Sequence, residues 1–81
     1  MKELRRHWGQ NVAAQRKLLF LTQRELAEKV GVTQQSISSI ERGEHAPSDA
    51  LKVRLVQHLE EPGAVLFPLE LGATLTGANP S

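Results

Sequence analysis

The sequence predicts an all-α domain built from five short helices. Apolar residues recur at helical spacing along the first quarter of the chain, and hydroxyl residues stand where three further helices need an N-cap. The chain has 81 residues, of which 40% are hydrophobic and 23% are charged, as in ordinary globular proteins. We therefore expect a single domain with a small core.

The first helix is expected over residues 4–19. Its apolar residues share one face, and the largest of them, Trp8, should be the main core anchor. Gly9 weakens this helix modestly because glycine is a poor helix former. The apolar stripe consists of Leu4, Trp8, Val12 and Leu19.

Two shorter helices are expected over residues 23–30 and 34–42. Each begins after a hydroxyl residue that can cap its N-terminus and ends at a glycine that is free to take a positive φ. A glutamate three residues after the first cap completes a capping box. The caps and stops are Thr22 with Glu25, Gly31, Thr33 and Gly43.

A fourth helix should begin after Ser48 and end before Pro62. A short fifth helix should follow within residues 62–67, with Val65, Leu66 and Phe67 turned toward the core. The apolar face of the fourth helix consists of Leu51, Leu55 and Leu59.

Two regions are expected along the chain. Residues 1–68 form the helical domain, whereas residues 69–81 show no helical period and form a tail that is either loose or in contact with a second subunit. Charge is uneven as well, because residues 1–24 hold six basic residues against Glu3, and residues 25–81 hold four basic and eight acidic residues. This asymmetry can steer a polyanion toward one side of a small protein.

The second and third helices are separated by only three residues, so they must meet at a tight corner. A tight corner between two helices needs a small residue where they touch, which is Ala27, and a residue that tolerates positive φ at the turn, which is Gly31. Apolar residues around the corner supply its buried side. These are Leu26, Val30, Val32, Ile37 and Ile40. A small residue, a glycine four residues later and apolar residues at these positions form the pattern of a DNA-binding helix-turn-helix.

Burial of the two isoleucines fixes the direction of the polar residues on the third helix. These residues should share the opposite face, which has no carboxylate in mid-helix, whereas a solvated helix would usually present Glu and Lys there. A glutamine amide can pair bidentately with adenine, and serine fits either kind of base edge. We therefore predict base reading by Gln34, Gln35, Ser38 and Ser39, with Arg42 on the same face.

The stretch from Trp8 to Phe67 resembles the Cro/CI-type helix-turn-helix family, also called the xenobiotic-response-element family. The residues that carry the resemblance are "LTQRELAEKVGVTQQSISSIERG", in which "TQQS" is similar to the start of the recognition helix in lambdoid phage repressors. The resemblance implies a five-helix, lambda-repressor-like DNA-binding domain. It also implies a partly buried salt bridge between Arg16 and Glu41, with Arg16 able to lean toward a phosphate.

The resemblance further implies contacts with the DNA backbone near the start of both motif helices, where helix N-termini favour anions. His45, in the loop after the third helix, is a further candidate. The residues expected at phosphate or mixed positions are Gln23, Thr33, Ser36, Arg42, Asn11, Arg16 and His45.

Four residues depart from the family pattern. Phe20 stands where glycine is usual, so that either the first helix closes differently or Phe20 is an exposed contact. Gln15 replaces an apolar residue, and Asn11 replaces an arginine but can still donate to a phosphate. Glu44 replaces a basic residue, and its charge should repel phosphate.

Several other functions have no support in the sequence. There is no cysteine, His7, His45 and His58 lack metal-ligand spacing, and no P-loop, dinucleotide glycine motif or nucleophile turn occurs. We therefore expect no enzyme activity, no metal and no cofactor. No signal peptide or membrane span is expected, so the predicted location is the cytoplasm, on the nucleoid.

Double-stranded DNA is the expected partner. The sequence predicts a transcriptional regulator, more specifically a repressor. It is expected to be a homodimer, because one small domain contacts few bases and useful specificity needs two half-sites. The alternative is a protein-interaction module, such as the antitoxin of a toxin–antitoxin pair or a phage recombination accessory factor.

Overall fold

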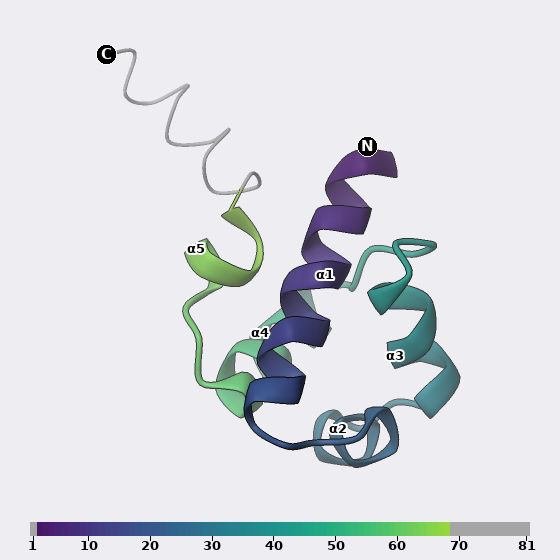
Figure 1. The fold of residues 1–81 in the computed structure, drawn as a ribbon, viewed down its shortest axis with the longest axis vertical. Helices are drawn as coiled ribbons and strands as arrows, with labels where there is room; N and C mark the ends of the chain where they lie inside the picture. The colour runs from purple at the N-terminus through teal and green to yellow at the C-terminus, as the bar shows by residue number, and fades with distance from the viewer. Residues whose placement is uncertain (1, 69–81) are drawn as a thin grey trace.

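The computed structural model describes residues 2–68 and shows five helices within them (Figure 1). They lie within one or two residues of the expected bounds, and the expectations about the tail fall outside the described residues. The helices are α1 (Lys2–Leu18), α2 (Gln23–Val30), α3 (Gln34–Glu41), α4 (Asp49–Leu59) and α5 (Gly63–Leu66).

Helix α1 runs through the middle of the molecule, with α3 on one side and α5 on the other (Figure 1). Helices α2 and α4 complete the enclosure of one core, to which all five helices contribute. Trp8, the expected anchor, is 5% exposed and meets Phe67 edge to face with ring centroids 5.5 Å apart. The buried apolar residues are Trp8, Val12, Leu26, Ala27, Val30, Ile37, Ile40, Leu51, Leu55, Leu59, Leu66 and Phe67.

The expected helix caps are confirmed. The backbone N–H of Glu25 donates to the Thr22 hydroxyl at 3.0 Å, and the N–H of Thr22 donates to the Glu25 carboxylate at 2.8 Å. This reciprocal pair lowers the pKa of Glu25, chiefly through the hydrogen bond from the Thr22 backbone. Thr33 and Ser48 likewise accept a backbone N–H at the start of α3 and α4.

Polar side chains bind the carboxyl ends of three helices. The Asn11 amide donates to the carbonyl oxygen of Leu66 at 3.0 Å, and the Gln15 amide donates to that of Leu59 at 2.9 Å. In the same way Arg54 donates to the last carbonyl of α2 at 2.8 Å. These bonds satisfy carbonyls that have no partner inside their own helix, which explains why Gln15 occupies a position where an apolar residue was expected.

Val65 differs from its expected position, and Phe20 decides between the two alternatives that the sequence left open. Val65 does not turn toward the core but is 51% exposed, because a helix as short as α5 can bury only one side, and Leu66 and Phe67 occupy it. Phe20 follows α1 with a φ of 59° and is 93% exposed. It therefore adopts the left-handed conformation of the usual glycine and also points into solvent.

Candidate nucleic-acid interface

The corner between α2 and α3 has the geometry that the sequence predicts. Gly31 takes a φ of 77°, and its N–H donates to the carbonyl of Ala27. The N–H of Val32 donates to the same carbonyl at 3.0 Å, which closes the turn in three residues. Ala27 is 2% exposed, so the contact between the helices requires a small side chain.

The start of α3 presents two glutamine amides to solvent. Gln34 and Gln35 are exposed in the first turn, and neither amide bonds to another residue of the part of the chain that the structure describes. Thr33 caps this turn, accepting the Ser36 N–H at 3.1 Å and donating to the Ser36 hydroxyl at 3.0 Å. The two amides are therefore free to bind an external donor and acceptor, as their predicted role requires.

Ser39 does not lie on this exposed face, which corrects the sequence-based placement. Its exposure is only 8%, and its carbonyl accepts the N–H of Glu44 at 2.9 Å. The loop between α3 and α4 folds back along this side of the helix and forms with it a shallow hollow of about 450 Å³ that includes His45. By helical periodicity Ser39 should point away from the core, but the loop between α3 and α4 leaves it almost fully buried.

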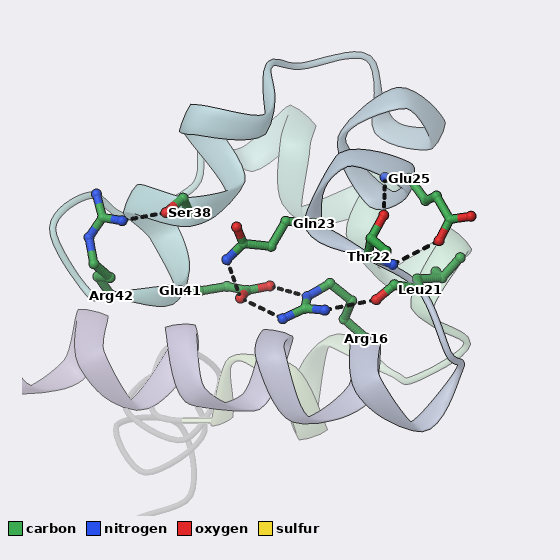
Figure 2. A network of polar contacts seen from close by, with 8 residues as sticks. All are labelled: Arg16, Leu21, Thr22, Gln23, Glu25, Ser38, Glu41 and Arg42. Carbon is green, nitrogen blue, oxygen red and sulfur yellow. Dashed lines mark hydrogen bonds and ion pairs between the residues drawn. The ribbon is translucent and has the colours of Figure 1, made fainter.

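Behind the exposed face, α3 is held by a buried ion pair, which confirms the salt bridge that the family resemblance implied. The Arg16 guanidinium donates to both carboxylate oxygens of Glu41, at 2.7 and 3.0 Å, and its third nitrogen donates to the carbonyl of Leu21 at 2.7 Å (Figure 2). The Arg16 and Glu41 side chains are only 11% and 7% exposed. Arg16 is thus engaged inside the protein and is not placed to meet a phosphate.

Gln23, at the first position of α2, joins the same network. Its amide nitrogen donates to Glu41 at 2.9 Å, so this carboxylate accepts from α1 and α2 while it belongs to α3 (Figure 2). Gln23 is half-buried, and its contact with a phosphate stays a prediction. Asn11 is placed differently, because its amide faces α5 across α1 from α3, so the predicted phosphate contact is not supported by its position.

The crossing of α1 and α3 reveals a role for Gly9 that the sequence pattern did not. A Cβ at Gly9 would stand 2.2 Å from the carbonyl oxygen of Ile40 and 2.7 Å from that of Glu41. The absence of a side chain thus lets the end of α3 lie directly on α1. A glycine inside an otherwise regular helix was the only signal, and it does not name the partner helix.

The carboxyl end of α3 carries basic groups from two helices. Arg42 caps α3 and pairs with Glu44 through two bonds of 2.9 and 3.1 Å. The negative charge of Glu44, which was expected to repel a DNA phosphate, is therefore paired with a positive one. Arg5 donates to the carbonyl of Gly43 at 3.5 Å, and a Cβ on Gly43 would stand only 2.7 Å from the Cα of Arg6. The sequence shows that Arg5 and Arg6 are basic, but their position beside α3 follows only from the packing of α1.

Within residues 2–68, no three His, Asp or Glu side chains gather as a metal ion would need. None of the helices in the same range has the length and the apolar composition needed to cross a membrane.

Comparisons with known proteins agree with this geometry. A family model described as Helix-turn-helix matches residues 12–65. An uncharacterized HTH-type transcriptional regulator from Methanothermobacter thermautotrophicus is 52% identical over 44 residues, which are 54% of this chain and 64% of that protein. The matched stretch therefore spans less than two thirds of the relative's length.

Solved structures share the fold. The clp gene regulator ClgR from Corynebacterium glutamicum superposes with a TM-score of 0.75 at 24% identity, with 96% of each chain covered. The restriction-modification controller protein C.AhdI from Aeromonas hydrophila also gives a TM-score of 0.75, at 25% identity, and covers 83% of this chain and 100% of its own. The five-helix arrangement thus recurs in chains that share only about a quarter of their residues with this one.

Proposed function

We propose that this chain, which belongs to the helix-turn-helix family of the Cro/CI type, binds double-stranded DNA sequence-specifically and regulates transcription. The observation that carries the proposal is the face of α3, where Gln34 and Gln35 present free amides just after a helix corner. The proposal is also supported by the relative from Methanothermobacter thermautotrophicus, which is described as an uncharacterized HTH-type transcriptional regulator.

In this proposal α3 enters the major groove. Gln34 and Gln35 read base edges, and each good bidentate pair contributes about 1–3 kcal/mol of discrimination. Phosphates accept hydrogen bonds from the protein near the start of α2 and of α3. Backbone N–H groups at these helix N-termini already favour an anion. The residues proposed at phosphates are Gln23, Thr33, Ser36 and His45, with Arg42, Arg5 and Arg6 at the other end of α3.

The test is a selection of bound sites from a random-sequence DNA library, repeated at several salt concentrations. Enrichment of a two-fold symmetric site supports the proposal, whereas weak binding to all sequences that salt abolishes contradicts it. Gln34→Ala and Gln35→Ala should each relax the base preference by about 1–3 kcal/mol, and Gln23→Ala should weaken all sequences alike. Gln10→Ala, at an exposed position of α1, is the matched control and should change neither the base preference nor the overall affinity.

We also propose that the protein acts as a homodimer through α4 and α5. An apolar groove of about 500 Å³ lies between them, lined in part by Val53, Val56 and Phe67. Val53 is 57% exposed and Val65 51%, so apolar side chains on both helices are accessible to a second copy of the chain. Sedimentation should give a dimer for the natural chain and a monomer for Val53→Glu, and a monomeric natural chain would contradict the proposal.

Repression is the proposed mode of regulation, because a small domain seated in the groove excludes other proteins from the same DNA. A reporter gene behind the selected site should be less active when the chain is present, and a rise in its activity would indicate activation instead. This function would place the protein in the cytoplasm, on the nucleoid.

One observation favours a second candidate, a protein-interaction module. Leu18 is 69% exposed and Phe20 93%, and both lie at the corner between α1 and α2. Such a pair of apolar side chains suits a protein partner better than a phosphate. The site selection separates the two candidates, since a pure protein-binding module would enrich no DNA sequence.

A further inference from the structure

Arg42 is bound on all three nitrogens by its own chain. Nε and Nη2 donate to the two carboxylate oxygens of Glu44, at 2.9 and 3.1 Å. Nη1 donates to the hydroxyl of Ser38, one helical turn earlier, a contact that Figure 2 shows. A guanidinium is planar and rigid, so two bonds to one carboxylate fix the direction of its third nitrogen. Glu44 thereby determines where Arg42 meets α3.

The charges of this pair stabilise each other. The hydrogen bond from Arg42 lowers the pKa of Glu44, and the hydrogen bond to Glu44 raises the pKa of Arg42. Glu44 is therefore a carboxylate at neutral pH, and it accepts both bonds. Arg42 and Glu44 are about half exposed, at 55% and 52% of their side chains, so the pair lies on the surface beside the exposed face of α3.

The contact with Arg42 restricts how Ser38 can bond to anything else, because it occupies one of the two lone pairs of the Ser38 oxygen. A guanidinium has only donors, so the Ser38 oxygen must accept in this bond, and its hydroxyl hydrogen remains available to donate. Without Arg42, the same hydroxyl could turn and accept as readily as it donates. Ser38 follows Gln34 by four residues, so both lie on the same side of α3.

We propose that Glu44, acting through Arg42, is a specificity-positioning residue that holds Ser38 as a hydrogen-bond donor toward the DNA. A donor at this position favours base edges that accept in the major groove, which are N7 and O6 of guanine, N7 of adenine and O4 of thymine. It disfavours the amino group of cytosine. The inference rests on the proposed entry of α3 into the major groove.

The simplest rival is that Glu44 only repels phosphate. Removal of its charge would then strengthen binding to every sequence and leave the base preference unchanged, because phosphate contacts carry no direct sequence information. The positioning role makes a different prediction, since loss of Glu44 frees Arg42 and with it the orientation of the Ser38 hydroxyl.

The experiment is a site selection with the natural chain, Ser38→Ala, Glu44→Ala, the double variant and one control. Both single variants should relax the preference at the same base pair of each half-site, by about three- to tenfold, which corresponds to one net hydrogen bond. The double variant should relax it no further, because the two residues act through one bond. Glu28→Ala is the matched control, since Glu28 is also exposed and paired with an arginine, on α2.

The outcomes separate the inference from the proposed function. If the natural chain selects a symmetric site but Glu44→Ala binds all sequences more tightly with the same preference, the positioning role is wrong and the proposed function stands. Relaxation at different base pairs in the two single variants would also overturn the role. If the natural chain selects no site, both are overturned. Thermal unfolding of the variants near the natural value ensures that a changed preference does not come from a changed fold.

Discussion

Replacement of Gly9 with alanine is expected to destabilise the fold, although alanine is the better helix former. The added Cβ would stand 2.2 Å from the carbonyl oxygen of Ile40 and 2.7 Å from that of Glu41. Both atoms are backbone, so neither can rotate away as the end of a side chain could. Helices α1 and α3 would have to separate by roughly 0.8 Å before the closer contact reached 3.0 Å, and a close-packed interior resists such a shift.

The magnitude follows from two opposing effects. The helix propensity of alanine favours the variant by about 0.8–1.0 kcal/mol over glycine. Overpacking of a core contact costs typically about 1–3 kcal/mol, and backbone against backbone belongs at the upper end. We therefore expect the free energy of unfolding to fall by about 1–2 kcal/mol, with a drop in Tm of about 4–8 °C for each kcal/mol in a domain of this size.

Urea unfolding of the natural chain, Gly9→Ala and Gly63→Ala provides the assay. Gly63 is the control because its added Cβ would have only an ordinary contact, with Val56 at 3.8 Å. That variant should be more stable by about 0.4–1 kcal/mol, since alanine restricts the unfolded chain. If Gly9→Ala proved as stable as the natural chain, with the same dependence on urea, the close crossing of α1 and α3 would be refuted.

Three further variants test other parts of the fold. Glu41→Ala should lower the free energy of unfolding by about 3–5 kcal/mol in urea, because it leaves the buried Arg16 unpaired, and a loss below about 1 kcal/mol would contradict that burial. Phe20→Gly should raise it by about 0.5–1 kcal/mol, because it relieves a left-handed backbone, and an unchanged Tm would argue against strain there. Glu25 has a lowered folded pKa, so its contribution is present above its ordinary value of 4.5 and is lost as pH falls through the folded pKa. Glu25→Gln should therefore flatten the acid side of a stability curve against pH, and a parallel curve would count against the capping box.

The features that depend on neighbours in sequence could be predicted. The capping box at Thr22 and the left-handed turn at Gly31 follow from local residue chemistry, and both are present as expected. The buried pair of Arg16 and Glu41 is 25 residues apart, and only the family resemblance supplied it. The helix bounds were close for the same reason as the caps, since each end is determined within about one turn.

The features that depend on how the helices pack could not be predicted from the sequence. Ser39 has an outward wheel position but is covered by the loop between α3 and α4. Asn11 has the chemistry to meet a phosphate, yet its amide is used by the carboxyl end of α5. Gly9 is recognisable as unusual within a helix, but only the position of α3 explains it. In each case the side-chain chemistry was clear and the neighbour was not.

The two sides of α3 have different roles in the proposed function. On the buried side, the crossing at Gly9 and the ion pair between Arg16 and Glu41 fix the helix on α1, so in the proposed complex its direction is set before DNA binds. On the exposed side, Gln34 and Gln35 keep free amides. Because α3 is already fixed, less conformational entropy is lost when it binds DNA, which favours the affinity. Changes behind α3 should therefore weaken binding to all sequences together, whereas changes on its exposed face should alter which sequence is preferred.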